Sequence, residues 1–404
     1  MSDRPDPATL AARAGLGAPG AGGEGVDLVA PLSLASVRAY ADLAALDQGM
    51  DSRDVYRRYG PASVALLERA VASLEQVDDE PLLARATASG QAALGLALAL
   101  LASPGRRRVV VVRPCYGGTD ALVAGPLGNL GLGLTLVDLP PDGYTDHGAL
   151  VGAALGADVC AVVLEVIANP LMVVVDVPAV TAVCRAAGVA TVVDATFATP
   201  FLFRGFAHGA DVVFHSLTKH LSGHSDVLGG ILLLREEHPA AGYLDGFSRL
   251  FGAVLAPFDA WLALRGLRTA ALRVERSSEN AEALAVFFAG RDEVASVHYP
   301  GMGGAADAER CARLLPGGRG PMLSLTLRGG RAAADALVRG LEGVRLAPSL
   351  GDVATTVSHP ALSSHRGLSA QQRAVLGISD GLVRVSVGIE RVDDLRDEFA
   401  AALG

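Results

Sequence analysis

Short runs of β-branched and other apolar residues alternate with segments of helical apolar spacing from about residue 60 onward. Helical spacing is present in PASVALLERAVASLE, and a second helix begins in SGQAALGLALALLAS. The runs RRVVVVRP, GLTLVDL, ADVCAVVLEV and VATVVDAT are bounded by Pro, Gly or Asp, which is typical of buried parallel strands. Strands separated by helices in this order predict an α/β doubly wound fold.

The pattern changes near residue 255. A long helical stretch, FDAWLALRGLRTAALRVERSSENAEALAVFFAG, precedes alternating segments such as PMLSLTLRG and GLVRVSVGI. We therefore expect an N-terminal arm over residues 1–55, a large α/β domain over 56–255 and a smaller α+β domain over 256–404. The Gly-rich residues 15–25 have no strand before them and no helical pattern directly after them, so they predict a mobile arm and not a nucleotide-binding loop.

Composition narrows the class of protein. The 404 residues are 50% hydrophobic and 19% charged, with a net charge of −9, which argues against a disordered chain and disfavours an extended nucleic-acid surface. The longest apolar run, residues 92–102, is too short to span a bilayer, and the start of the chain lacks the apolar region of a signal peptide. We expect no nucleic-acid partner and no membrane insertion.

The cysteines indicate the redox compartment. Cys115, Cys160, Cys184 and Cys311 are widely scattered and form no C-x-x-C pair. This spacing suits a reducing cytoplasm better than a disulfide framework or a zinc site. We therefore expect a cytoplasmic protein without a metal centre.

The basic residues are unusual, because Lys219 is the only lysine among 34 Lys and Arg residues. Arginine replaces lysine wherever only a cation is needed, but it cannot form a Schiff base, and its pKa above ~12 prevents it from acting as a base. The count alone leaves two alternatives open. Lys219 is either a residue that the chemistry requires or a surface lysine that survived by chance.

The neighbourhood of Lys219 favours the first alternative. In GADVVFHSLTKHLSGHSDVLGG a predicted strand runs into Ser216 and Thr218, whose hydroxyls could hold a phosphate while the amine reaches a carbonyl carbon. Another apolar strand ends in Asp194, and ligands of open α/β sheets bind at the carboxyl ends of the strands. A carboxylate there can pair with a protonated pyridine nitrogen. Taken alone, Asp194 is also a common turn or cap residue.

Two further features are predicted at the same sheet edge. Ser89, Gly90 and Gln91 open a helix, whose free N–H groups and positive dipole end suit a phosphate, although Ser89 alone would be an ordinary N-cap. Tyr116 follows the strand RRVVVVRP, where its ring could stack on a planar cofactor. The alternative for Tyr116 is a partly buried loop tyrosine.

Together these motifs closely resemble those of a known family. HSLTKHLSGHSDVLGG, VVDATFATPF, YGGT, SLG, HPALSSH and GLVRVSVGIERVDDL resemble the pyridoxal-phosphate (PLP)-dependent enzymes of Cys/Met metabolism, from about residue 50 to the end of the chain. This group contains cystathionine γ-synthase, cystathionine γ-lyase and methionine γ-lyase. The resemblance implies a fold-type I, aminotransferase-like architecture, PLP bound by the domain over 56–255, and γ-elimination or γ-replacement on an amino acid with a γ-leaving group.

The resemblance also implies roles for individual residues. Lys219 would bind PLP covalently and move protons, Tyr116 would stack on the ring and act as an acid or base, and Arg384, with Ser349 beside it, would bind the substrate carboxylate, a task suited to a guanidinium group. The other residues that it places around the cofactor are Ser89, Gly90, Gln91, Asn169, Asp194, Thr196, Ser216 and Thr218.

Tyr56 and Arg58 match the segment of this family that reaches the phosphate of a neighbouring subunit. The resemblance thus implies a homotetramer built from two catalytic dimers with shared active sites. The alternative for this pair is an exposed aromatic residue and an exposed cation that precede a helix.

The expected substrate pocket departs from the family pattern. Gly118 stands where methionine γ-lyases carry a reactive cysteine, and Ala354 stands where cystathionine-handling members have a glutamate. Leu350 replaces a tryptophan of the β-lyases, which disfavours β-elimination, and Gln91 replaces a methionine. The choice between elimination and replacement therefore stays open. A methionine γ-lyase-type C–S cleavage and a specialised biosynthetic substrate also stay open as alternatives.

Two other classes of protein are disfavoured. A PLP-binding protein without catalysis would not need Lys219, Tyr116 and Arg384 together. A nicotinamide-dependent Rossmann enzyme needs G-x-G-x-x-G after its first strand and an acidic residue about 20 positions later, and the sequence has no such arrangement.

Overall fold

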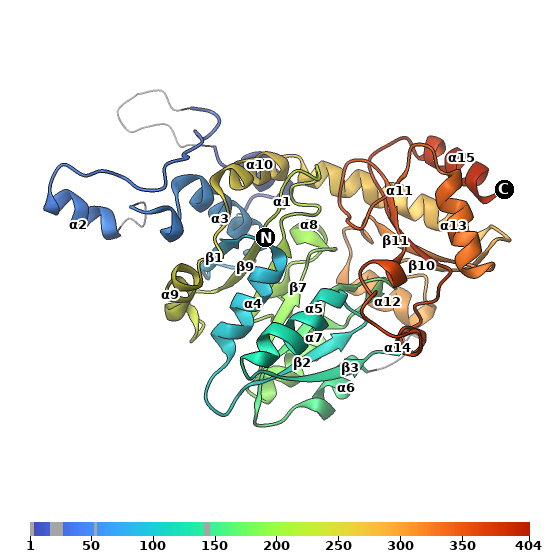
Figure 1. Cartoon of the computed structure of the whole chain (residues 1–404), viewed down its shortest axis with the longest axis horizontal. Helices are drawn as coiled ribbons and strands as arrows, with labels where there is room; N and C mark the ends of the chain where they lie inside the picture. The colour runs from blue at the N-terminus through green and yellow to red at the C-terminus, as the bar shows by residue number, and fades with distance from the viewer. Residues whose placement is uncertain (1–3, 17–26, 52–54, 141–145) are drawn as a thin grey trace.

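The computed structural model describes residues 4–16, 27–51, 55–140 and 146–404. Most of the Gly-rich stretch over 15–25, and with it part of the predicted N-terminal arm, lies outside the described residues. The described chain contains a large central sheet and a smaller C-terminal sheet, which lie side by side in Figure 1.

The central sheet has seven strands. β9 pairs antiparallel with both of its neighbours, whereas the remaining pairs of strands are parallel. In spatial order the strands are β1 (Leu82–Thr87), β9 (Gly230–Arg235), β8 (Val212–Ser216), β7 (Ala190–Asp194), β4 (Val159–Glu165), β2 (Arg108–Arg113) and β3 (Gly133–Asp138). The predicted α/β fold with a mostly parallel sheet is confirmed.

Helices cover both faces of the central sheet, which explains why its strands are continuous apolar runs. In β2, Val110 and Val112 pack into the core on one face, whereas Val109 and Val111 pack into the core on the other, because successive side chains of a strand alternate. The first core includes side chains of α3 (Ala62–Glu75), α6 (His147–Ala154), α7 (Val177–Ala186) and α10 (Pro257–Leu267). The second includes α4 (Gly90–Leu101) and α9 (Ala241–Phe251).

The C-terminal sheet has five strands and its own core. Its strands, in spatial order, are β10 (Val294–His298), β11 (Met322–Leu327), β14 (Leu382–Ser386), β13 (Thr356–Ser358) and β12 (Arg345–Leu346). The helices that pack on it are α11 (Ala270–Ala289), α13 (Gly330–Gly340) and α15 (Val392–Leu403). Phe288 of α11 and Phe399 of α15 are fully buried and meet edge to face, with ring centroids 5.0 Å apart.

Shorter elements connect these layers. α2 has no buried residue and extends away from the rest of the fold (Figure 1). The remaining helices are α1 (Pro7–Ala12), α2 (Leu43–Asp51), α5 (Gly117–Leu122), α8 (Thr199–Leu202), α12 (Ala305–Leu314) and α14 (Ala370–Val375). One short hairpin pairs β5 (Ile167–Ala168) with β6 (Val173–Val174), and single helical turns occur at Arg57–Tyr59, Val123–Leu127, Gly205–His208 and Pro360–Leu362.

Helix α11 belongs to both cores. Its first turns bury Ala270 and Val274 in the core of the large sheet, and its last turns bury Leu284 and Phe288 in the C-terminal core. The two sheets are therefore joined by one continuous helix of 20 residues. The predicted domain limits, at residues 55 and 255, stay a prediction.

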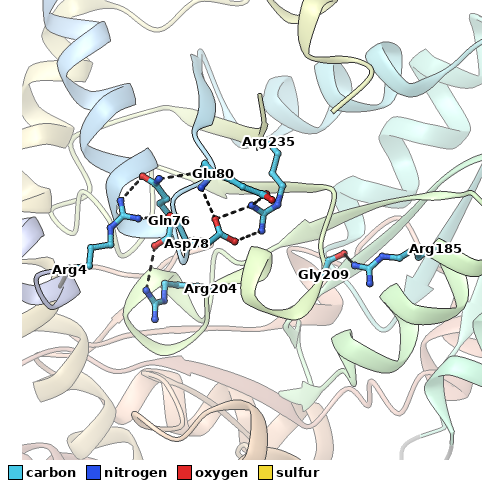
Figure 2. Close-up of polar contacts among 8 residues, drawn as sticks. All are labelled: Arg4, Gln76, Asp78, Glu80, Arg185, Arg204, Gly209 and Arg235. Carbon is cyan, nitrogen blue, oxygen red and sulfur yellow. Dashed lines mark hydrogen bonds and ion pairs between the residues drawn. The ribbon is translucent and has the colours of Figure 1, made fainter. Parts of the chain in front are cut away.

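Arginine side chains tie loops and strands together around the end of α3 (Figure 2). Arg235 of β9 donates to the carboxylate of Asp78 at 3.0 and 3.1 Å and also contacts Glu80, so the α3–β1 loop is held against the edge of the sheet. Arg4 donates to the backbone oxygen of Asp78 at 2.9 Å and contacts Gln76. These contacts need only a cation with several donors, which arginine supplies.

No helix in the described ranges is long and apolar enough to cross a membrane. The four cysteines are all free and buried. Within the same ranges, no group of three or more His, Cys, Asp or Glu side chains is arranged to hold a metal ion.

The buried pair of phenylalanines makes the C-terminal core testable. Replacing Phe399 by alanine removes a fully buried ring and leaves a cavity, so we expect the free energy of unfolding to fall by about 3–5 kcal/mol in urea denaturation. Val286→Ala on α11 is the control, because Val286 is 65% exposed and its loss should change stability by about 0.5 kcal/mol or less. Equal effects of the two substitutions would contradict this packing.

Candidate active site

A cavity of about 410 Å³ opens at the carboxyl ends of the central strands, where ligands of open α/β sheets bind. β7 ends at Asp194, β4 ends at Glu165, and Lys219 follows the end of β8. Of the residues predicted to form the site, the cavity is lined by Ser89, Gly90, Gln91, Tyr116, Asn169, Asp194, Thr196, Ser216, Thr218, Lys219 and Arg384. The fold thus brings together segments that are far apart in the sequence.

Lys219 lies in this cavity with its amine next to a hydroxyl. Its Nζ donates to Ser349 Oγ at 2.9 Å, which brings the predicted Ser349 to the site from the C-terminal domain. Burial, followed by the charge of the Arg384 guanidinium, lowers the pKa of Lys219 to about 8. An amine with this pKa is present in both its neutral and its protonated form near neutral pH.

The turn that carries Lys219 is held from two sides. Arg273 of α11 is buried and donates to the backbone oxygens of His220 at 2.7 Å and of Leu221 at 3.2 Å. On the other side Gly351 has φ of +84°, and a Cβ atom there would lie 2.5 Å from His220 N. Only glycine therefore allows the segment with Ser349 to approach the lysine this closely.

The start of α4 opens into the cavity. Ser89 is the N-cap of α4 and accepts from Ala92 N at 3.1 Å, as the sequence predicted, so the N–H groups of the first turn face the cavity end of the helix. Gly90 packs against Ser216, since a Cβ on Gly90 would lie 3.1 Å from Ser216 Cβ. Thr218 Oγ1 accepts from Gly229 N at 3.0 Å and so stays beside this helix end.

Two carboxylates, the buried Glu165 and the partly buried Asp194, lie next to each other at the back of the cavity. Glu165 and Asp194 pair in register on neighbouring parallel strands. Asp194 Oδ1 accepts from Thr196 N at 2.8 Å, and burial raises the pKa of Asp194. Burial, followed by the charge of Asp194, raises the pKa of Glu165 to about 8.

Arg384 closes the opposite wall. It lies on β14 of the C-terminal sheet and is buried, and burial lowers its pKa to about 10. Its Nη1 donates to Asn169 Oδ1 at 2.8 Å and its Nη2 to the Ser349 backbone oxygen at 3.0 Å. Its Nε is buried without a partner in the described structure, so this guanidinium group has a donor left for a ligand.

Tyr116 stands at the mouth of the cavity. Tyr116 precedes α5 and is 45% exposed. Its backbone N–H donates to Glu165 Oε1 at 2.5 Å. A Cβ on Gly118 would lie 2.5 Å from Gln91 Nε2, so the absence of a side chain at Gly118 makes room for the Gln91 carboxamide. Gly118 and Gln91, which both depart from the family pattern, are therefore direct neighbours.

Tyr56 and Arg58 do not join the other predicted residues. Tyr56 is 45% exposed, and Arg58 Nη1 donates to the Arg249 backbone oxygen at 2.7 Å, at the end of α9. Neither residue lines the cavity of its own chain. Their predicted contact with a cofactor phosphate stays a prediction.

Glu165 is the functional candidate that sequence reasoning missed. The signal was present, because ADVCAVVLEV is an apolar strand that ends in an acid, as VATVVDAT does at Asp194. Leu350, which the sequence placed in the substrate pocket, also lines the cavity. The cavity is completed by apolar and hydroxyl side chains that the sequence did not single out, namely Leu94, Thr119, Ile167, Phe197, Phe214, Leu228, Pro348, Ser363 and Ser364.

The fold and this cavity define a fold-type I PLP-dependent enzyme, and the comparisons with known proteins agree. The profile of the family "Cys/Met metabolism PLP-dependent enzyme" matches residues 10–404. The chain therefore belongs to this family, whose members include PLP-dependent γ-elimination and γ-replacement enzymes. The resemblance seen in the motifs, and the PLP dependence that it implied, are confirmed.

Three relatives show the range of activities near this chain. An L-methionine gamma-lyase of Brevibacterium sandarakinum is 38% identical over 86% of this chain and 83% of its own length. A cystathionine gamma-synthase of Mycobacterium leprae is 36% identical over 99% of this chain and 94% of its own length. The structure of a cystathionine gamma synthase from Xanthomonas oryzae pv. oryzae in complex with cystathionine superposes with a TM-score of 0.89, at 34% identity, over 99% of this chain and 98% of that one.

The lowered pKa of Lys219 predicts its chemical reactivity. In the cofactor-free protein, we expect reductive methylation of Lys219 to rise with pH around a midpoint near 8, because the amine reacts only in its neutral form. Peptide mapping by mass spectrometry measures the modified fraction, and Lys219 is the only lysine of the chain.

The same protein unfolded in urea is the control, and its Lys219 should titrate near ~10.4. Arg384→Gln should raise the midpoint of the folded protein, because it removes a neighbouring cation. A folded-state midpoint equal to the unfolded one would contradict the described environment.

Proposed function

We propose that the cavity binds PLP between Lys219 and Asp194 and catalyses γ-elimination or γ-replacement on an amino acid. The observation that carries this proposal is the buried amine of Lys219, which has a pKa of about 8 and lies in one cavity with a buried carboxylate and a helix N-terminus. When bound, PLP supplies an aldehyde that reacts with amines and a pyridine ring that accepts electrons.

The residues fit this cofactor. Asp194 accepts from Thr196 N and forms no ion pair with an arginine or a lysine among the described residues, so a protonated ring nitrogen would supply a cation beside it. The N–H groups of Gly90 and Gln91, with the hydroxyls of Ser89, Ser216 and Thr218, would hold the phosphate. Tyr116, Asn169 and Thr196, which also line the cavity, would contact the ring.

Lys219 and Tyr116 would transfer the protons. Lys219 Nζ would take a proton from the substrate Cα and return protons later, which suits an amine with a pKa of about 8. The Tyr116 hydroxyl would donate a proton to the leaving group. Ser349 Oγ orients the amine, because it accepts from Nζ at 2.9 Å.

Arg384 would bind the α-carboxylate of the substrate. Its guanidinium group is fixed by Asn169 and by the Ser349 backbone, and its buried Nε is available as a further donor. This clamp would place the substrate Cα close to Lys219, since Ser349 contacts both residues.

The side-chain pocket supports a substrate that differs from those of the typical members. Gly118 and Gln91 replace the family's cysteine and methionine at one wall, and Leu350 lines another. We propose an uncharged γ-substituent, because the rest of the lining is apolar or carries hydroxyls. A methionine γ-lyase-type cleavage is the second candidate, supported by the 38% identical relative of that name.

The function is tested with the purified protein loaded with PLP. We expect turnover of γ-substituted amino acids, either to a 2-oxo acid and ammonia without a thiol or to a thioether product only when a thiol is present. Lys219→Ala and Lys219→Arg should both lose at least about 10²–10⁴-fold in kcat, and the absorbance band of the bound cofactor should change. Because arginine keeps the charge but cannot form a Schiff base, full turnover by Lys219→Arg would contradict the proposal.

We further propose that two copies of the chain share each active site, within a homotetramer located in the cytoplasm. Support comes from Tyr56 and Arg58, which match the family segment but lie outside their own cavity. Beside them α9 exposes the large apolar side chains of Tyr243, Leu250 and Phe251, which a second copy would cover. The four free, buried cysteines support a reducing compartment.

Subunit sharing is tested by complementation. Arg58→Ala and Lys219→Ala should each be almost inactive alone. When the two variants are unfolded, mixed and refolded together, hybrid dimers should regain one intact site of two, so activity returns to about a quarter of the wild-type value for random pairing. Refolding each variant by itself is the control. If the mixture stays as inactive as its components, each site uses residues of a single chain.

A further inference from the structure

The carboxylate of Glu165 is bonded at both oxygens to backbone N–H groups of two different segments. Oε1 accepts from Tyr116 N at 2.5 Å, and Oε2 accepts from Asn169 N at 2.8 Å. Tyr116 follows β2, and Asn169 follows the short strand β5. One buried side chain therefore fixes two loops that meet at the cavity.

These two loops carry different parts of the site. The Tyr116 backbone sets where its ring lies at the mouth of the cavity. The Asn169 side chain accepts from Arg384 Nη1 at 2.8 Å, Arg384 Nη2 donates to the Ser349 backbone at 3.0 Å, and Ser349 Oγ accepts from Lys219 Nζ at 2.9 Å. A continuous chain of hydrogen bonds thus runs from Tyr116 through Glu165 to Lys219.

A carboxylate at this position is costly for the fold. Glu165 is 7% exposed and pairs in register with the acidic Asp194, and Asp120 adds a third negative charge to its surroundings. The attraction of Arg384 and the two N–H donors oppose that cost. A glutamine has the same shape without the buried charge, so stability alone does not explain the glutamate.

We infer that Glu165 is a positioning residue, which orients Tyr116 toward the cofactor ring and Arg384 toward the substrate carboxylate. Its carboxyl group does so because each of its two oxygens accepts from one of the two N–H groups, whereas a carboxamide has a single acceptor oxygen. In Glu165→Gln one acceptor becomes an NH₂ group that faces an N–H group, so one of the two loops loses its anchor. The inference rests on the proposed function for the identity of the substrate, but not for the binding of PLP.

The test compares Glu165→Gln with wild type in three measurements. We expect the dissociation constant of PLP from the protein to rise about tenfold, and with a turned-over amino acid we expect KM to rise and kcat to fall about tenfold each, since the hydrogen bond that anchors one of the two loops is lost. The thermal midpoint should change little, because the loss of this hydrogen bond is offset by the removal of an acidic group that is costly to bury. Glu165→Asp keeps the acidic group but reaches only one N–H group. Its values should therefore lie between those of wild type and those of Glu165→Gln.

Glu68→Gln is the matched control. Glu68 is also buried, accepts from Ala86 N at 2.9 Å and lies 3.6 Å from Arg85, away from the cavity. This variant should lower the thermal midpoint and leave KM, kcat and the PLP dissociation constant unchanged. If Glu165→Gln behaves like Glu68→Gln, or like wild type in all three measurements, Glu165 is a structural residue and the inference is wrong.

The same experiment separates the two proposals. If the wild-type protein turns over no γ-substituted amino acid, the proposed function fails, and the PLP dissociation constants of the Glu165 variants still decide the inference. If wild type is active and Glu165→Gln binds PLP and substrate equally well, the function stands and the positioning role falls.

Discussion

An ammonium group loses favourable hydration when it is buried, and this loss governs the cavity around Lys219. The amine has a neutral hydroxyl as its partner, and the charged group that acts on it is the cation of Arg384. Burial and the Arg384 cation both favour the neutral amine. A carboxylate at the same distance would instead have stabilised the ammonium form and kept the amine unreactive near neutral pH.

The acids and the cations of the site come from different parts of the fold. Asp194 and Glu165 end two parallel strands of the large sheet, whereas Arg384 and Ser349 belong to the C-terminal domain. The acids therefore lie at the back of the cavity, and the cation lies across it from them. Asn169 connects the two sides, because its backbone N–H donates to Glu165 and its side-chain oxygen accepts from Arg384.

Much of this arrangement could be predicted from the sequence, for local reasons. The parallel strands are apolar runs because both of their faces are buried, and Asp194 and Lys219 follow strand ends, where such sheets bind ligands. Ser89 was predictable as an N-cap. The contact of Lys219 with Ser349 was not, because 130 residues separate them in sequence and only the packing of the two domains brings them together. Glu165 was missed because nothing local distinguishes an anchoring acid from a strand-ending one.

Helix α11 connects the chemistry to the architecture. Its first turns pack on the large sheet, its last turns pack in the C-terminal core, and Arg273 in the first turns holds the turn that follows Lys219. Because no flexible linker separates the two cores at this point, a rotation of the C-terminal sheet would be transmitted along a rigid rod of about 30 Å. Such a rotation would also displace Arg273, and with it the backbone of the turn that follows Lys219.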